Sequence, residues 1–258
     1  MSNSISNTGT PEKTSRKPRK GHSGRSYKTA AGLTKKPKKM RGRKLSSQRW
    51  LTRQLNDPFV SQSQERGLRS RSAIKLEQMD DKHKFLRPHM KVVDLGCAPG
   101  GWLQIAAKRC KIDAGMGKLI GIDLLETEAV SGAHILRGDI YDQSMLRDIK
   151  SYLQGSDADI VLSDMAAATT GHRPTDHLRT MGLLEVALDF AGEVLTEGGI
   201  FLGKSFRGGA DESLLALLKN RFKKVKHLKP PASRVESVET YLLAVDFNKT
   251  RNLKKSNN

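Results

Sequence analysis

Residues 91–102 read KVVDLGCAPGGW, and this stretch decides the fold. A short apolar run containing Val92, Val93 and Leu95 stops abruptly in small residues. The pattern is typical of a buried parallel strand that turns through glycines into a helix. Glycines let the backbone approach a ligand with no Cβ in the way, and Asp94 lies near the strand's carboxyl end, where open α/β sheets bind ligands. The stretch therefore predicts a site for a nucleotide-like cofactor without identifying the cofactor.

Apolar strands and helical segments alternate along the rest of the chain. Further strands are expected at 118–123, 134–139, 158–164, 200–206, 225–228 and 240–247. Helices are expected at 46–56, 59–66, 70–79, 102–110, 144–153, 177–195 and 211–222. The alternation favours an α/β fold, a seven-stranded and mostly parallel sheet with helices on both faces. No helix separates the last two strands, so we expect them to form an antiparallel pair that closes the sheet edge.

Positive charge is concentrated at the N-terminus of the chain. Residues 1–50 hold fifteen Lys and Arg and one acid, whereas the other 208 residues hold 31 basic and 26 acidic side chains. Residues 1–44 have too little apolar surface to offset the entropy of ordering, so we expect a disordered basic arm. A domain at 45–247 and a basic tail at 248–258 complete the predicted organisation. Basic arms commonly neutralise phosphates, which favours nucleic-acid contact over a purely solubilising role.

The chain contains no apolar run of transmembrane length and no apolar core of a secretory signal. The arm also lacks an amphipathic face that could bind a membrane surface. A mitochondrial transit peptide is a weaker alternative, because Pro and Gly disfavour the helix it needs. Cys97 and Cys110 match no metal-ligand spacing and indicate a reducing compartment. We therefore expect a cytoplasmic protein with no membrane partner and no metal.

Four of the predicted strands end in or near an aspartate. These residues are Asp94, Asp123, Asp139 and Asp164. The carboxyl ends of parallel strands meet at one edge of a sheet, so the four carboxylates should converge there. Each also has a structural explanation, since Asp commonly ends strands and caps helices. Asp123 follows the glycine turn by about twenty residues, the spacing at which an acid binds ribose hydroxyls in nucleotide folds.

The glycine spacing of the turn argues against a dinucleotide. Glycines stand at 96, 100 and 101, not in the GxGxxG pattern that cradles a pyrophosphate. A cofactor with ribose and adenine but no phosphate fits better, and S-adenosylmethionine is such a cofactor. Asp139 would then hydrogen-bond the adenine amine. A dinucleotide-dependent oxidoreductase is the alternative, and it gives no role to the basic residues considered next.

Lys204 lies within an apolar strand, FLGKSF at 201–206. A buried lysine is costly unless it is paired or functional, and burial lowers its pKa. Asp164 and Glu239 are its expected partners. The alternative is a lysine at a sheet edge whose ammonium group reaches solvent.

Arg66, Arg69 and Arg71 lie close together in the helical region that also holds Lys75. Guanidinium groups next to a nucleotide site suit phosphate binding, so we expect these arginines to bind RNA. The alternative is a solvated basic face with no specific partner.

The chain closely resembles the FtsJ/RlmE-type 2′-O-ribose methyltransferases, which modify a uridine of the 23S ribosomal RNA in the large subunit. The matching stretches, spread over residues 46–247, are SSQRWL, GLRSRSAIKL, VVDLGCAPGGW, GIDLL, RGDIYD, VLSDMA, LGKSFRGG and PPASRVESVETYLLA. Together, in this order, they are a specific match. The resemblance implies a Rossmann-like, S-adenosylmethionine-dependent methyltransferase fold and a role in ribosome biogenesis.

The resemblance also implies which residues form the site. The family's Lys–Asp–Lys–Glu catalytic tetrad falls on Lys75, Asp164, Lys204 and Glu239. Its S-adenosylmethionine contacts fall on Gly100, Trp102, Asp123, Asp139 and Asp164. The chain departs from the family at Cys97, where alanine is usual, and at Ala166–Ala168, where a proline commonly follows. The second departure concerns the loop after Asp164 and no member of the tetrad.

Two roles are open for Lys204 in such a reaction. With a lowered pKa it can accept the proton of the ribose 2′-hydroxyl, and as ammonium it can favour the developing alkoxide. Asp164 and Glu239 would orient it, and Lys75 would position the ribose. Neighbouring acids favour the charged lysine, so orientation and charge stabilisation compete with base catalysis as its contribution.

Two other functions are alternatives to rRNA methylation. A non-catalytic RNA-binding assembly factor would be expected to lose tetrad members, and all four are present. A methyltransferase of the same chemistry that acts on tRNA or an mRNA cap differs only in substrate. His172 and His177 lack the cysteines or acids of a metal site and are expected to touch RNA from a loop. We expect a monomer.

Overall fold

The computed structural model describes residues 42, 45–155, 157–167, 170–207 and 212–250. The expected basic arm, apart from Gly42, and the tail beyond residue 250 lie outside these ranges.

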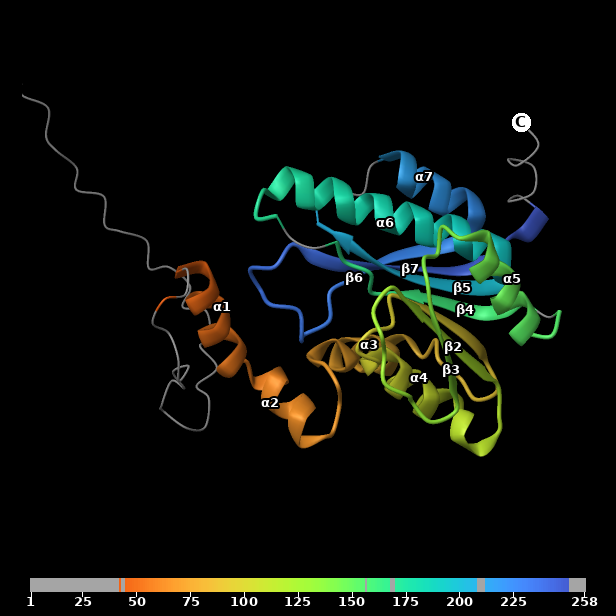
Figure 1. Cartoon of the computed structure of the whole chain (residues 1–258). Coiled ribbons are helices and arrows are strands. Elements are labelled where there is room, and N and C mark those ends of the chain that lie inside the picture. The colour runs from red at the N-terminus through yellow and green to blue at the C-terminus, as the bar shows by residue number, and fades with distance from the viewer. Residues whose placement is uncertain (1–41, 43–44, 156, 168–169, 208–211, 251–258) are drawn as a thin grey trace, which may run out of the picture. The chain divides into compact units, whose positions relative to one another are not determined.

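A seven-stranded sheet organises the described fold (Figure 1). Its strands, in the order in which they lie, are β3 (Ala133–Arg137), β2 (Lys118–Asp123), β1 (Lys91–Leu95), β4 (Ala158–Ser163), β5 (Leu195–Phe206), β7 (Glu239–Phe247) and β6 (Phe222–Leu228). β1 to β5 pair in parallel, and β7 pairs antiparallel with both β5 and β6. The predicted α/β class and the antiparallel final pair are confirmed, with β6 rather than β7 at the edge.

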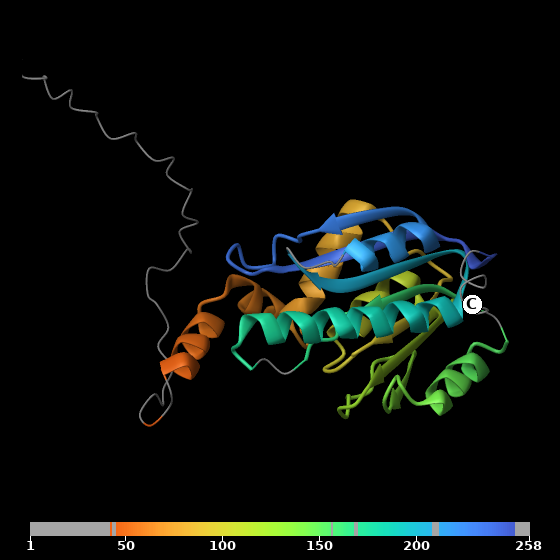
Figure 2. The same ribbon diagram turned by 90° about the horizontal axis from the view of Figure 1, so that it is seen from above.

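Helices cover both faces of the sheet. They are α1 (Leu45–Leu55), α2 (Pro58–Glu65), α3 (Arg71–His83), α4 (Gly101–Cys110), α5 (Gln143–Tyr152), α6 (Arg173–Val194) and α7 (Glu212–Arg221), with a short 3-10 helix at Ile112–Ala114. α3 and α4 pack on one face, and α5, α6 and α7 on the other. Figure 2 shows α6 and α7 running alongside the neighbouring strands. Because both faces are covered, the central strands read as nearly continuous apolar runs.

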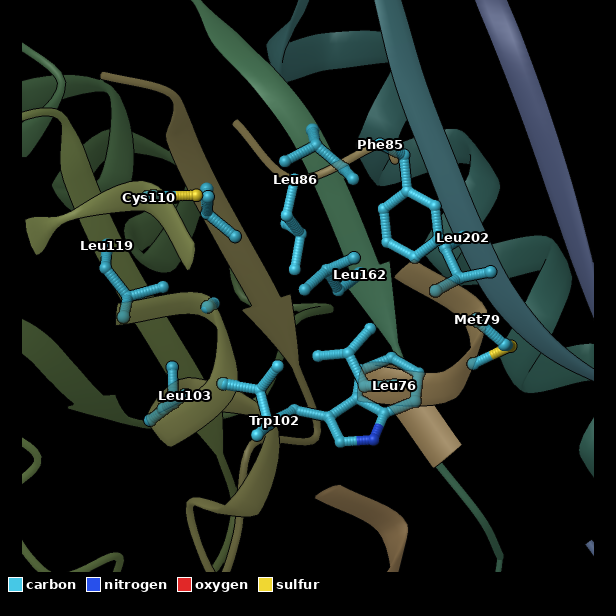
Figure 3. Close-up of a cluster of buried hydrophobic side chains, with 14 of the residues drawn as sticks. Leu76, Met79, Phe85, Leu86, Trp102, Leu103, Cys110, Leu119, Leu162 and Leu202 are labelled. Carbon is cyan, nitrogen blue, oxygen red and sulfur yellow. The ribbon is translucent and has the colours of Figure 1, made fainter. Parts of the chain in front are cut away.

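The core on the α3 and α4 side is built from side chains of both helices and of the strands beneath them. Figure 3 shows Leu76 of α3 and Trp102 of α4 next to Leu162 of β4. Along β1, Val92 belongs to this core and Val93 to the core on the opposite face. Since side chains alternate along a strand, Asp94 projects toward the α3 and α4 side, among apolar neighbours.

Several boundaries differ from those predicted. β5 begins at Leu195, before Gly198 and Gly199, because Leu195 already pairs with Ala158. The register then shifts between Ala158 and Ile160, and Gly198 adopts a φ of +76° within the irregularity. Gly198 and Gly199, which were predicted to end the preceding helix, therefore lie at an irregularity inside a strand. Conversely, β3 ends at Arg137, which leaves Asp139 beyond the strand.

α3 is one turn longer than predicted and ends at His83 rather than Met79. α2 begins as the local sequence dictates. Asp57 is its N-cap and accepts a hydrogen bond from the amide of Phe59, and Pro58 occupies the first helical position. Within the described ranges, no helix is both long and apolar enough to cross a membrane.

Candidate active site

The glycine turn between β1 and α4 is tied to the neighbouring strand β2. The amides of Gly96 and Cys97 both donate to the carbonyl of Ile122, at 2.8 and 3.1 Å. The amide of Ala98 donates to Asp123 Oδ2 at 2.9 Å. Asp123 Oδ1 accepts from the amide of Leu125 at 2.8 Å. Asp123 therefore organises the turn as well as being available to a ligand at its edge.

Arg69 straps this turn to the loop after β2. Its Nη1 donates to the carbonyls of Pro99 and Glu128, at 3.1 and 2.7 Å, and its Nη2 donates to that of Ala129 at 2.7 Å. A Cβ at Gly100 would stand 2.5 Å from Arg69 Nη1, and the φ of Gly100 is +101°. Both the close approach and the left-handed backbone require glycine at this position.

Asp94 lies buried beneath the turn with no partner for either carboxylate oxygen among the described residues. Its side chain is 0% exposed. Burial, together with the charges of Asp164 and Asp123, holds the pKa of this carboxyl well above its ordinary value. The environment of Asp94 therefore favours its protonated form relative to a solvated carboxyl. Asp139, in contrast, is exposed and accepts from the amide of Tyr141 at 3.1 Å.

The structure brings the four predicted tetrad residues together at the same edge of the sheet. Lys204 Nζ lies 3.3 Å from Asp164 Oδ1 and 3.5 Å from Glu239 Oε2. Lys75 Nζ, from α3, forms an ion pair with Glu239 Oε1. The side chains of Lys204, Asp164 and Glu239 are only 12–15% exposed. Two lysines and two carboxylates thus alternate in one largely buried network.

Tyr241 joins the two carboxylates and was not predicted from the sequence. Its hydroxyl lies 3.0 Å from Asp164 Oδ1 and 3.3 Å from Glu239 Oε1. The Lys75 ammonium lies 5.9 Å from the centre of its ring. Tyr241 follows Glu239 by two positions on β7, so both side chains share one face of the strand. That spacing was the available signal, although an apolar strand also explains a tyrosine.

Lys204 is charged in this environment. Burial lowers the pKa of its ammonium group, but the carboxylates of Asp164 and Glu239 outweigh burial, so the net shift is upward. For Glu239, burial raises the pKa, and the two lysines overcome that effect and bring it to about 2. The geometry therefore favours the charged forms of Lys204 and Glu239, and the predicted alternative of a Lys204 with lowered pKa is not what it produces.

The comparisons with known proteins address the same residues. The family model described as FtsJ-like methyltransferase matches residues 68–247, which include the turn, the acids and all four tetrad positions. The chain belongs to this family. It is therefore a methyltransferase, an enzyme that requires a methyl donor and an acceptor.

Relatives agree with this assignment. The chain is 56% identical over 210 residues to "Ribosomal RNA large subunit methyltransferase E" of Mesorhizobium japonicum, covering 81% of this chain and 79% of the relative. It is 51% identical to the protein of the same name from Parvibaculum lavamentivorans, covering 84% and 88%. A solved structure from Plasmodium falciparum, named as a ribosomal RNA methyltransferase, is 30% identical with a TM-score of 0.62 and covers 69% of this chain and 98% of its own.

Within this FtsJ-like methyltransferase, Trp102 takes a different place from the one expected of a cofactor contact. Its side chain is 3% exposed, belongs to the core, and donates from Nε1 to the carbonyl of Ser72 at 2.9 Å. The ring packs 5.8 Å from that of Tyr241. The indole therefore supports the site from below, which leaves its backbone, at the start of α4, as the part that can face a ligand.

Each of the three arginines predicted to bind RNA has partners within the chain. Arg66 makes two hydrogen bonds to Glu77, at 2.6 and 2.7 Å. Arg69 is the strap on the glycine turn, and Arg71 pairs with Asp57 and donates to the carbonyl of Ala232 at 3.2 Å. Intramolecular acceptors thus occupy the donors predicted to bind RNA, because the surrounding acids and carbonyls satisfy guanidinium groups locally. Their contact with RNA remains a prediction.

The two histidines belong to α6 and its start rather than to a loop. His172 is the N-cap residue of α6, and its Nδ1 lies 2.8 Å from Thr175 Oγ1. His177 lies within the helix, with its ring centre 6.2 Å from that of Phe206 at the end of β5. In the described ranges no group of three or more His, Cys, Asp or Glu side chains is arranged to hold a metal ion.

Proposed function

We propose that this chain transfers a methyl group from S-adenosylmethionine to the 2′-oxygen of a uridine ribose in 23S rRNA of the large ribosomal subunit. The observation that carries the proposal is the network of Lys75, Asp164, Lys204 and Glu239 at the sheet edge that also holds the glycine turn. The names of the relatives support ribosomal RNA as the substrate. The reaction would take place in the cytoplasm during ribosome biogenesis.

The residues at the turn fit S-adenosylmethionine. Asp123 and Asp139 offer carboxylates for ribose hydroxyls and the adenine amine, and the backbone at Gly100 and Trp102 belongs to the same turn. Both oxygens of the buried Asp94 carboxyl below the turn lack a partner among the described residues, and a bound ligand or its water can satisfy such a group. When bound, S-adenosylmethionine supplies an electrophilic sulfonium methyl group.

Lys204 acts through its charge. An ammonium group has no lone pair and cannot accept the 2′-hydroxyl proton, but it stabilises the negative charge that develops on the oxygen as that proton leaves. The carboxylate of Asp164, 3.3 Å from Lys204, would accept the proton as the oxygen forms its bond to the methyl group. A fixed, preorganised charge and a fixed acceptor lower the barrier without reorganisation during the reaction.

Glu239 and Lys75 hold this arrangement in place. Oε2 of Glu239 forms an ion pair with Lys204. Oε1 forms an ion pair with Lys75 and accepts hydrogen bonds from the hydroxyls of Ser233 and Tyr241. Lys75 is 6% exposed at its side chain and comes from a different face of the fold, on α3. We propose that Lys75 orients the ribose by hydrogen bonding while Glu239 keeps the two ammonium groups apart.

Methyl transfer to isolated ribosomal subunits tests the proposal. The purified chain should transfer tritiated methyl from S-adenosylmethionine to large subunits that lack the modification, and Lys204→Ala should lose this activity while still binding S-adenosylmethionine. Activity on tRNA but not on large subunits would contradict the substrate. Full activity of Lys204→Ala would contradict the mechanism.

A further inference from the structure

A groove with a volume of about 810 Å³ lies between the C-terminal part of α3 and the end of β6. Its side walls carry basic side chains: Lys82 and His83 from α3, and Lys226, His227 and Lys229 from β6 and the residue after it. Apolar side chains of Met79, Leu228, Pro230 and Pro231 also line it. The groove is separate from the tetrad network, and the catalytic mechanism uses none of these residues.

The positive charge of the groove is not neutralised within the described chain. Lys82 and Lys226 are exposed, and neither makes an ion pair with any described residue. The acid that lines the groove, Asp81, is engaged by Arg109 at 2.6 Å and faces Lys84 at 3.9 Å. Cations are thus gathered around an open groove that lacks anions to match them.

Two further basic residues on the groove walls, His83 and Lys229, show which cations are available to a ligand. Burial and then the charges of Lys226 and Lys82 lower the pKa of His83, so the lysines lie close enough for their fields to overlap there. Lys229 instead has a structural task, because its Nζ donates to the carbonyls of Val235 and Ser237, at 3.2 and 2.7 Å. Lys82 and Lys226 are therefore the two cations of the groove that are available to a ligand.

The groove and the tetrad share their supporting elements. Lys82 follows Lys75 on α3 by seven residues, which is about 10 Å along the helix axis. Leu228 pairs with Tyr241 in the sheet. The segment that follows Pro231 is pinned to both sites: the amide of Ala232 donates to Gln78 Oε1 at 2.8 Å, and Ser233 Oγ donates to Glu239 at 3.2 Å.

We propose that this groove binds the sugar–phosphate backbone of the RNA strand that flanks the target nucleotide, with Lys82 and Lys226 contacting phosphates. The inference rests on the proposed function and adds the direction in which the RNA leaves the active site. The distance of about 10 Å along α3 between Lys75 and Lys82 corresponds to the length of about three stacked nucleotides. Exposed lysines on both walls suit a polyanion, and the prolines and Leu228 between them offer apolar surface to sugars and bases.

Binding of a fluorescein-labelled RNA stem–loop by the full chain, followed by fluorescence anisotropy at several salt concentrations, tests the groove. The variant is Lys82→Gln/Lys226→Gln. The control is Lys108→Gln/Lys219→Gln, which removes two exposed lysines on α4 and α7 that have no described ion-pair partner. Each lost phosphate contact lowers the slope of log K against log salt by about 0.7–0.9. We expect the magnitude of this slope to fall by about 1.5 in the groove variant and to stay almost unchanged in the control.

Methyl-transfer kinetics on large subunits separate the groove from the proposed function. We expect the groove variant to raise KM by about tenfold and to keep kcat, whereas Lys204→Ala should lose kcat and retain RNA affinity. If the wild-type chain methylates rRNA while the groove variant has an unchanged slope and KM, the groove inference is wrong and the function stands. If the variant binds RNA normally but fails only on assembled subunits, the groove docks a ribosomal protein and the RNA inference is overturned.

Discussion

Glu239 is the residue on which the candidate site depends most. It receives both lysines, together with Ser233 and Tyr241, and its pKa is lowered to about 2 although burial alone would raise it. A carboxylate in this position is stable only because two cations surround it. The charges of Asp164 and Glu239 in turn raise the pKa of Lys204. Charge balance, rather than any single pair, fixes the geometry of the site.

The lowered pKa of Glu239 predicts how stability depends on pH. Its folded-state pKa of about 2 lies below the ordinary 4.5, so its contribution to stability is fully present above about pH 4.5 and is lost as the pH falls toward 2. A shift of this size corresponds to roughly 3 kcal/mol. Urea unfolding of the wild type and Glu239→Gln at pH 2–7 measures it. The difference in unfolding free energy should shrink toward low pH, and a difference that stays constant contradicts the ionised network.

The raised pKa of Asp94 predicts the opposite dependence of stability on pH. Because its folded-state pKa is raised, its contribution to stability is fully present below the unfolded pKa and is lost as the pH rises above that value toward the folded-state pKa. Asp94→Asn removes the titration and keeps the shape. In the absence of cofactor we expect the unfolding free energy of the Asn variant, relative to that of the wild type, to be higher at pH 8 than at pH 5. A destabilised Asn variant at both pH values would show that Asp94 is ionised and partnered.

The segments that carry the site are the elements whose ends the sequence predicts well. The strand-to-turn stretch at 91–102 has an unambiguous apolar run and glycine stop, and β1 and α4 begin and end close to where it places them. The start of β5 is harder to predict from the sequence. Gly198 and Gly199 locally indicate a break, whereas Leu195 pairs with Ala158 across the sheet. Local glycine chemistry and non-local pairing gave different answers there, and pairing decided.

The arginines show the limit of residue-type arguments. Arg66, Arg69 and Arg71 form a cluster in sequence, but their acceptors, Glu77, the carbonyls around Pro99 and Asp57, lie in segments that only the fold brings near. Tyr241 is a similar case, since its hydroxyl gains a role only where β7 lies beside β5. The resemblance implied the four tetrad positions, and they lie together because three stand at or near strand ends and Lys75 lies on a helix next to them.

The Arg69 strap predicts a separation between cofactor binding and chemistry. Arg69→Ala should free the glycine turn from the loop at 128–129 and raise the Kd for S-adenosylmethionine by about tenfold, since two or three hydrogen bonds of a charged group to carbonyls are lost. Calorimetric titration measures the Kd. Arg66→Ala, whose guanidinium pairs with Glu77 away from the turn, is the control and should bind normally; equal weakening in both variants would argue against the strap.

At the scale of the whole molecule, a moderately basic body carries a strongly basic N-terminal arm. Residues 1–50 hold fifteen Lys and Arg and one acid, and long-range attraction to RNA grows with the number of phosphates neutralised. The arm and the groove would then act on different parts of one RNA: the groove fixes the strand next to the target, and the arm adds attraction that carries no sequence information.

Removal of the arm tests this division of labour. A chain beginning at Ser46 should bind RNA less tightly than the full chain and with a shallower salt dependence, because fewer counterions are released. At saturating RNA its kcat should equal that of the full chain. Affinity measured at several salt concentrations, with turnover measured alongside, checks both statements. An unchanged salt slope would assign the arm a solubilising role instead.

The central claim is that the methyl group is placed on a ribose 2′-oxygen held beside Lys204. Large subunits lacking the modification can be treated with the chain and with S-adenosylmethionine that carries a deuterated methyl group, and their 23S rRNA digested to nucleosides for mass spectrometry. The label should appear in 2′-O-methyluridine, and Lys204→Ala should leave that nucleoside unlabelled. Label found in a base-methylated nucleoside, or in 2′-O-methyluridine at the wild-type level with Lys204→Ala, would contradict the account.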